Sequence, residues 1–304
     1  MTQTVTNLQA GLYLVATPIG HLGDISPRAR LVLEQADRVA AEDTRHSKSM
    51  LQALGVRTKA PLVSLHAHNE AQQTDSLVEA IGRGLSIALI SDAGTPAVSD
   101  PGSRLVAAAH RAGAMVTPVP GPSALTAALS VSGLEAPGGS PVCFWGFLPN
   151  RTKARRAHFQ LLSKTPGLHT VFESPHRIHE ALADASEVLG PKTTMFLARE
   201  MTKRFETIFQ GTVAEVQSRL DSATAIDSKA ARGEYVLLFR VEDRPASGAL
   251  TQWGPGLWAD ELRAHVPAPA LAKILSKAFG LEREVAYGLA IPPQKSQGDD
   301  GPTP

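Results

Sequence analysis

The chain has 304 residues, with 30 basic and 29 acidic side chains and one cysteine, Cys143, and is long enough for about two domains with a buried core in each. The balanced charge excludes a protein that holds nucleic acid or membrane through its overall field, and the single cysteine excludes a disulfide framework and a multi-cysteine metal site. Because no apolar run reaches the ~20 residues of a membrane span and residues 1–9 are not typical of a signal peptide, we expect a soluble cytoplasmic protein without membrane contacts.

The first part of the chain alternates between predicted strands and helices. An apolar strand over residues 12–16 ends in a loop, residues 17–24, that contains glycines but matches neither a dinucleotide-binding motif nor a P-loop. A helix begins at Ser26-Pro27, because serine is a good N-cap and proline is favoured in the first helical turn. This alternation predicts a parallel sheet covered by helices.

Two polar clusters follow the next predicted strands. Residues 42–46 come after a strand and fit either a functional edge of the sheet or a solvated turn with a helix cap at Asp43 or Thr44. Residues 66–70 contain two histidines and a glutamate after another short strand. Two histidines with a carboxylate could suggest a metal site, but no further ligand is in sight and surface histidines are common. We therefore expect no bound metal.

The most informative stretch is residues 87–102. Its first four residues are apolar and predict a buried parallel strand, and the turn that follows combines Gly94 with prolines that fix φ. We expect the next helix to hold Pro101 in its first turn, with Ser99 or Asp100 as its N-cap. A rigid loop between the carboxyl end of a strand and a helix is where open α/β sheets bind ligands, so we expect this loop to hold a small cofactor.

The second half of the chain predicts a different architecture. A strand over residues 115–119 and a helix capped by Ser123 lead to a Gly/Pro-rich passage and then an aromatic strand over residues 142–149. The shorter helices and additional strands beyond it are typical of a mixed α+β domain. Four cations after the aromatic strand are a candidate for phosphate contact, with a solvated basic helix face as the alternative: Arg151, Lys153, Arg155 and Arg156.

We therefore expect an N-terminal parallel-sheet α/β domain over residues 1–120 and a mixed-sheet α+β domain over residues 121–244. A Pro/Gly/Ser-rich linker, residues 245–256, precedes a short helical extension over residues 257–291. Residues 292–304 have the composition of a disordered tail.

Seven short motifs, spread over roughly residues 10–245, are more informative together than singly. They are Thr17-Pro18-Ile19-Gly20-x-Leu22-Gly23-Asp24, Ala41-Glu42-Asp43-Thr44-Arg45, Ser64-Leu65-His66-x-His68-Asn69-Glu70, Ser91-Asp92-Ala93-Gly94-Thr95-Pro96, Pro120-Gly121-Pro122-Ser123-Ala124, Gly146-Phe147-Leu148-Pro149 and Glu173-Ser174-Pro175-His176-Arg177. In this order they resemble the ribosomal RNA small-subunit methyltransferase I family of the tetrapyrrole-methylase superfamily. Three residues depart from the family pattern: His21, Ala67 and Asn150. These departures bear on the expected RNA contacts more than on cofactor binding.

The resemblance implies an S-adenosylmethionine-dependent enzyme that methylates the 2′-hydroxyl of a cytidine ribose in the decoding region of small-subunit (16S) ribosomal RNA. It implies a two-domain tetrapyrrole-methylase-like fold with the cofactor in the cleft between the domains. It also implies a homodimer that acts on 16S rRNA or on the small ribosomal subunit.

The resemblance and the chemistry of the turns indicate site residues of three kinds. The expected cofactor contacts are Pro18, Ile19, Asp92, Gly94, Thr95, Ser123, Ala124, Phe172, Gly233 and Glu234. A ribose hydroxyl is a poor nucleophile until it loses its proton, so we expect a general base nearby, and the candidates are Asp43, Glu70, Glu173 and Glu200. The expected RNA contacts are Arg45, Arg151, Lys153, Arg155, Arg156, Arg177 and Lys203.

Two alternatives stay open at this point. A methyltransferase of the same superfamily would act instead on a tetrapyrrole precursor or on a diphthamide intermediate. A protein of another class, a non-catalytic RNA-binding module for ribosome assembly, would use the basic stretch and the helical extension without any methyl donor.

Overall fold

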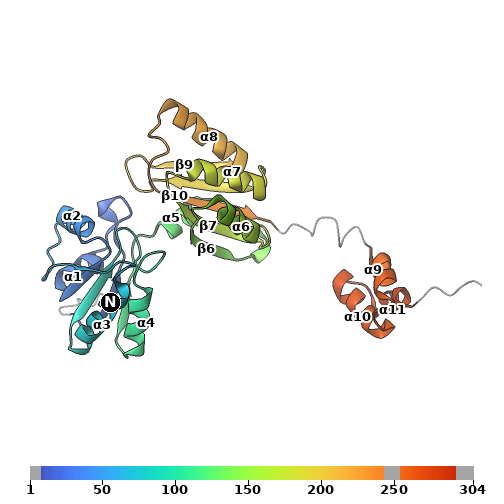
Figure 1. Cartoon of the computed structure of the whole chain (residues 1–304), viewed down its shortest axis with the longest axis horizontal. Coiled ribbons are helices and arrows are strands. Elements are labelled where there is room, and N and C mark those ends of the chain that lie inside the picture. The colour runs from blue at the N-terminus through green and yellow to red at the C-terminus, as the bar shows by residue number, and fades with distance from the viewer. Residues whose placement is uncertain (1–7, 243–253, 292–304) are drawn as a thin grey trace, which may run out of the picture. The chain divides into compact units, whose positions relative to one another are not determined.

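The computed structural model describes residues 8–242 and 254–291. The chain forms two compact units, residues 1–243 and residues 244–304 (Figure 1). The expected disordered tail and all but three residues of the expected linker lie outside the described residues. No helix among the described residues is both long and apolar enough to cross a membrane.

The first sheet of unit 1 is entirely parallel, with the strand order β3-β2-β4-β1-β5. Its strands are β1 (Gly11–Val15), β2 (Arg38–Ala41), β3 (Val63–Ser64), β4 (Ser86–Ile90) and β5 (Val116–Val119). Every residue of β4 is buried. A central strand of a parallel sheet is covered on both faces, which explains why the sequence of β4 is a continuous apolar run after Ser86.

Four helices cover the two faces of this sheet (Figure 1). The short 3-10 helix η1 (Leu22–Asp24) precedes α1 (Pro27–Gln35), which packs with α2 (Thr44–Leu54) on one face. On the other face lie α3 (Glu70–Gly82) and α4 (Ser103–Arg111). The Oγ of Ser26 accepts a hydrogen bond from the Ala29 N–H, so the predicted cap of α1 is confirmed.

The start of α4 differs from the prediction. The helix begins at Ser103 with Gly102 as its N-cap, and Ser99 has a positive φ of 66°. The Oε1 of Glu70 accepts hydrogen bonds from the N–H groups of Gly102 and Arg104, both at 3.0 Å. A carboxylate from α3 therefore caps α4, which local sequence patterns could not reveal, and the predicted cap at Ser99 or Asp100 is wrong.

The second sheet of unit 1 is mixed, with the strand order β6-β7-β10-β8-β9. Its strands are β6 (Val142–Phe147), β7 (Gly167–Glu173), β8 (Thr194–Arg199), β9 (Thr207–Thr212) and β10 (Tyr235–Val241). Only the β6–β7 pair is parallel among these strands. The predicted combination of a parallel α/β sheet with a mixed sheet is therefore confirmed.

The two faces of the second sheet are covered differently (Figure 1). One face packs against α6 (Thr152–Leu162), α7 (Ile178–Val188) and α8 (Val213–Ile226) around a core that includes Phe159 and Phe239. The other face packs against α5 (Ala124–Val131). The proposed domain boundary after residue 120 thus falls between β5 of the first sheet and α5, and it stays a prediction.

The described part of unit 2, residues 254–291, forms three short helices with a small core of their own. They are α9 (Pro255–Leu262), α10 (Ala268–Phe279) and α11 (Arg283–Ala290), packed around Leu271, Leu275 and Ala286. Gly280 ends α10 with a φ of 65°, a left-handed conformation that glycine adopts without steric cost.

Candidate active site

A pocket of about 360 Å³ lies at the carboxyl edge of the first sheet. The segments after β1, β2, β4 and β5 contribute Ile19, Glu42, Asp92 and Ser123 to its wall, and the second sheet contributes Phe172. Open α/β sheets bind ligands at this edge, and the volume is typical of a site for a small molecule. The pocket is therefore our candidate for the cofactor site.

The loop after β4 is tied to its neighbours on two sides. Gly94 and Thr17 exchange two backbone hydrogen bonds, of 2.8 and 3.0 Å, and the Thr95 hydroxyl donates to the carbonyl of Pro122 at 3.1 Å. Gly94 has a φ of 80°, and a Cβ there would lie 3.3 Å from Cγ2 of Ile19. The loop thus has little freedom, as the prolines and glycines of the sequence predict.

Three carboxylates in the pocket wall, those of Glu42, Asp92 and Asp100, form no ion pair with any described residue. Burial raises the pKa of Glu42 above its ordinary value, and the nearby charges of Asp100 and Asp92 raise it further. Burial likewise raises the pKa of Asp100, against the effect of a hydrogen bond from Ser91. The pocket wall therefore contains three carboxylates without a cation partner among the described residues, beside Glu173 and Glu234, which are paired with Arg177 and Lys203.

Eight of the ten predicted cofactor residues line this pocket: Ile19, Asp92, Gly94, Thr95, Ser123, Ala124, Phe172 and Glu234. Pro18 and Gly233 do not line it. Gly233 has a φ of 112°, and a Cβ there would lie 2.4 Å from Cγ of Glu200, so any other residue at this position would be strained.

Sequence reasoning missed other residues of the wall: Glu42, Ala93, Val98, Ser99, Asp100, Phe147, Tyr235 and Val236. The sequence did contain a signal for some of them, because Glu42 belongs to a polar cluster after a strand and Phe147 ends an aromatic run. Phe147 is more than half exposed, and a break in the β6–β7 register between Phe144 and Phe147 sets it apart from the regular part of the strand.

Two of the four predicted base candidates serve as helix caps. Oδ1 of Asp43 accepts hydrogen bonds from the N–H groups of Arg45 at 2.8 Å and His46 at 3.4 Å, at the start of α2. The alternative interpretation of this cluster, a helix cap at Asp43, is thus confirmed. Glu70 caps α4, as described above, and neither residue lines the pocket.

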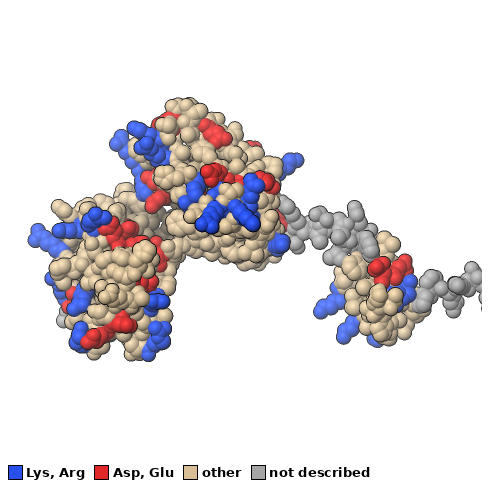
Figure 2. All heavy atoms as spheres, in the orientation of Figure 1, with Lys and Arg blue, Asp and Glu red and all other residues tan. Residues whose placement is uncertain are grey.

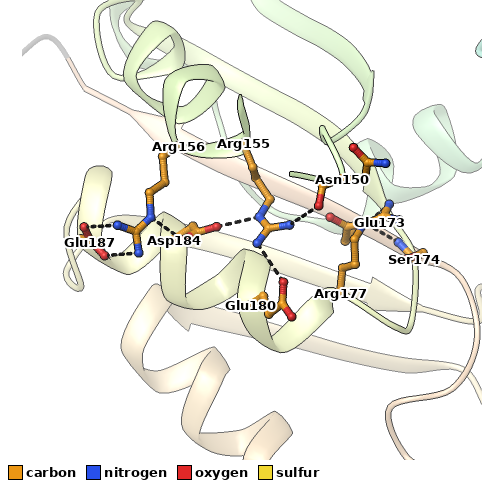
Figure 3. Close-up of polar contacts among 9 residues, drawn as sticks. All are labelled: Asn150, Arg155, Arg156, Glu173, Ser174, Arg177, Glu180, Asp184 and Glu187. Atoms are coloured by element: carbon orange, nitrogen blue, oxygen red, sulfur yellow. Dashed lines mark hydrogen bonds and ion pairs between the residues drawn. The ribbon is translucent and has the colours of Figure 1, made fainter. Parts of the chain in front are cut away.

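The other two base candidates are paired with cations. Glu173 is buried, and its Oε1 accepts hydrogen bonds from Arg177 and from the Ser174 N–H, both at 2.6 Å (Figure 3). Glu200 accepts from Lys203 at 2.9 Å and from the Glu234 N–H at 3.0 Å. Burial alone would raise the pKa of Glu200, but these hydrogen bonds hold it below its ordinary value.

The predicted RNA-binding cations of α6 are divided between the interior and the surface. Arg155 is completely buried, and its guanidinium pairs with Asp184 at 2.7 Å and Glu180 at 3.1 Å, while Arg156 pairs with Asp184 and Glu187 (Figure 3). Figure 2 shows blue and red side chains interleaved over α6 and α7.

The other predicted cations of the second half are either exposed or paired with carboxylates. Arg151 and Lys153 are exposed. Arg177 is held by Glu173, and Lys203 bridges Glu200 and Glu234. The arrangement argues against a phosphate contact by Arg155, whose charge is already neutralised inside the protein.

Comparison with known proteins identifies the family. Residues 11–217 match the model of the Tetrapyrrole (Corrin/Porphyrin) Methylases. A protein named Ribosomal RNA small subunit methyltransferase I from Xylella fastidiosa is 42% identical over 277 residues, covering 91% of this chain and 97% of the relative. Its namesake from Escherichia coli O157:H7 is 37% identical, covering 96% and 98%. The chain belongs to the ribosomal RNA small-subunit methyltransferase I family.

Solved structures agree with this assignment at the level of the fold. A diphthine synthase superposes with a TM-score of 0.52 at 17% identity, covering 76% of this chain and 89% of that protein. A cobalt precorrin-4 methyltransferase superposes with a TM-score of 0.51 at 18% identity, covering 75% and 93%. The family predicted from the seven motifs is confirmed, and with it a methyltransferase that uses S-adenosylmethionine.

Proposed function

We propose that this methyltransferase transfers the methyl group of S-adenosylmethionine to the 2′-hydroxyl of a cytidine ribose in 16S ribosomal RNA. The observation that carries the proposal is the pocket at the carboxyl edge of the first sheet, with carboxylates that no cation of the fold neutralises. S-adenosylmethionine contains a sulfonium and an ammonium group. A cation-free pocket rich in carboxylates favours such a ligand electrostatically.

The remaining lining residues fit the rest of the cofactor. Phe147, Phe172 and Val236 provide apolar surface for an adenine ring. Ser123 is the N-cap of α5, yet its hydroxyl makes no capping hydrogen bond and is free to bind a ligand. The N–H groups at the start of α5 are suited to a carboxylate such as that of the methionine end. Bound there, the cofactor would supply an electrophilic methyl group.

We propose Glu42 as the general base in place of the four candidates expected from the sequence. Each of those four is a helix cap or is paired with a cation. Glu173 also lines the pocket but is held by Arg177, whereas Glu42 lines it without a cation partner among the described residues. A carboxylate with a raised pKa is a stronger base than an ordinary one. Glu42 would accept the hydroxyl proton as the oxygen attacks the methyl carbon, and the carbon–sulfur bond electrons would stay on sulfur.

Holding the hydroxyl and the methyl carbon in line accounts for most of the expected acceleration, because methyl transfer is an in-line displacement. The hydrogen bonds that fix the loop after β4 suit this positioning role. A homodimer and a cytoplasmic location stay part of this proposal, and light scattering of the purified protein tests the first.

The decisive experiment measures tritium transfer from labelled S-adenosylmethionine to three acceptors: bare 16S rRNA, small ribosomal subunits and a tetrapyrrole precursor. We expect label in ribosomal RNA, at a 2′-O-methylcytidine after nuclease digestion. Label in the tetrapyrrole alone would assign the pocket to another methyltransferase class. An absence of transfer together with RNA binding would instead support a non-catalytic assembly factor.

A further inference from the structure

A second hollow in unit 1, of about 910 Å³, lies between α2 and the segment that follows it. Its wall consists of Thr44, Arg45, Lys48, Leu51, Gln52, Gly55, Val56, Arg57, Thr58, Lys59, Ala60, Pro61 and Leu62. We call it the α2 groove. It is larger and more open than the cofactor pocket, which suits a polymer better than a small molecule.

The α2 groove contains four cations, Arg45, Lys48, Arg57 and Lys59, and no carboxylate belongs to its wall. Because the whole chain has a net charge of only +1, this local excess is not a general property of its surface. Figure 2 shows Lys and Arg side chains on the surface over α2, the helix that Figure 1 labels at the left of the view.

These four cations are largely available to a ligand. Lys48 and Arg57 are exposed and form no ion pair with any described residue. The side chain of Arg45 is 91% exposed and lies 3.5 Å from Asp43, and Lys59 lies 3.4 Å from Asp37. Ion pairs this exposed contribute little, so a phosphate can replace them at small cost.

The lining of the groove begins close in the sequence to the lining of the cofactor pocket. Glu42 lines the pocket, and Thr44, two residues later, lines the groove. From there α2 extends for 11 residues, a length of about 16 Å. Arg45 and Lys48 lie three residues apart, so they share one side of this helix. A polymer that lies along the groove would therefore lead towards the pocket.

The wall of the groove contains no aromatic residue or histidine. Proteins that read single-stranded bases usually stack them on aromatic rings, whereas cations without such rings contact the backbone. We propose that the α2 groove binds the phosphodiester backbone of the substrate RNA next to the target nucleotide. This inference rests on the proposed RNA methylation, and it replaces α6 as the main backbone contact.

The test is the double variant Lys48→Ala/Arg57→Ala, because neither side chain forms an ion pair within residues 8–242 and 254–291 whose loss would destabilise the protein. Methyl transfer to small ribosomal subunits is measured as kcat and KM at several salt concentrations between 50 and 200 mM. Loss of two phosphate contacts on a single strand predicts a roughly 10- to 30-fold higher KM near 0.1 M salt and a salt slope lower by about 1.4. We expect kcat and the affinity for S-adenosylmethionine to stay unchanged.

Two further variants make the result specific. Lys164→Ala/Lys192→Ala removes the same charge from exposed positions in the second sheet region and should leave KM and the salt slope unchanged. Arg151→Ala/Lys153→Ala tests the surface of α6. An unchanged salt slope in the groove variant, or an equal change in either comparison variant, overturns the inference. KM can be measured only if the wild type methylates RNA. An inactive wild type would therefore contradict the proposed function, whereas an active wild type with an unaffected groove variant would contradict the inference about the groove.

Discussion

The charged side chains of two regions of unit 1 are arranged in opposite ways. On the helical face of the second sheet, Arg155 and Asp184 are both buried and lie 2.7 Å apart, and Arg177 neutralises Glu173. At the carboxyl edge of the first sheet, Glu42 and Asp100 line a pocket and form no ion pair with any residue that the structure describes. The first region uses charge to join elements of the fold, and the second leaves charge for a ligand.

The difference shows that the number of charges along the sequence is a poor guide to a site. The α6 segment has the densest run of cations in this region of the sequence, but two of its four cations are bound to carboxylates of the fold. Buried charges need such partners, because an isolated charge in the interior is strongly destabilising. A charge that remains unpaired at a pocket therefore deserves a functional test.

The largest effect should come from Glu42→Gln. Glutamine has nearly the same shape but cannot accept a proton, so kcat for RNA methylation should fall by about 10²- to 10⁴-fold. In the wild type, kcat/KM should decrease towards acid pH as Glu42 becomes protonated, beginning at a higher pH than for an ordinary glutamate.

The matched control for this prediction is Glu34→Gln, at an exposed position of α1. It should leave kcat unchanged. Isothermal titration calorimetry with S-adenosylmethionine separates a loss of chemistry from a loss of binding. If Glu42→Gln retained the wild-type kcat, Glu42 could not be the base.

On the other side of the comparison, Arg155→Ala should reduce stability rather than chemistry. It leaves Asp184, which is only 3% exposed, without its main buried partner, although Arg156 still contacts this carboxylate. Removing one partner of a buried pair typically costs about 3–5 kcal/mol, and we expect the lower end of this range. Urea unfolding measures the change, and Lys153→Ala on the same helix should stay within about 0.5 kcal/mol of the wild type.

Asp92→Ala should weaken binding of S-adenosylmethionine by about 10- to 100-fold, as expected for the loss of a hydrogen bond to a charged group. Its Oδ1 also accepts a hydrogen bond from the Asp43 N–H at 3.1 Å. Asp92→Asn can keep that bond, so it separates the ligand contact from the internal one. Calorimetry that gave the wild-type affinity for Asp92→Ala would remove Asp92 from the cofactor site.

The sequence predicted the elements and the edge at which the pocket lies, because these depend on local patterns. The apolar run of β4 and the glycines and prolines after it determine a buried strand and a stiff loop within a few residues. The seven motifs contain six of the eight predicted cofactor residues that line the pocket, and the resemblance to the family supplied the other two, Phe172 and Glu234. Local patterns and the order of the motifs were therefore sufficient to predict most of the candidate site.

The sequence could not decide which charges were neutralised, because that depends on residues far apart in the chain. The partner of Arg155 is 29 residues away, and Glu70 caps a helix that begins 33 residues later. Asp43 and Glu42 are adjacent and chemically similar, yet Asp43 caps α2 while Glu42 lines the pocket. Only the three-dimensional arrangement distinguishes the two.

The smallest expected effect, from Asp100→Asn, tests whether the pocket carboxylates repel one another. The negative charge of Asp100 helps to raise the pKa of Glu42, so its removal should move the acid limb of kcat/KM to lower pH. The raised pKa of Asp100 means that the folded protein holds this proton more tightly than the unfolded chain does. The carboxyl group therefore favours folding at low pH, and this contribution is lost as pH rises through the raised pKa.

Asp100→Asn should consequently stabilise the protein at pH 8, and the gain should be smaller at pH 4, where more of Asp100 is protonated. Melting temperatures at the two pH values measure it, with Asp75→Asn at an exposed position of α3 as the control. The same variant should bind S-adenosylmethionine more weakly, since it removes one carboxylate from the pocket. A gain in stability together with a loss of binding is the result expected when a charge is kept for a ligand. A loss of stability at pH 8 would show that the hydrogen bond from Ser91 outweighs the cost of burying the charge of Asp100.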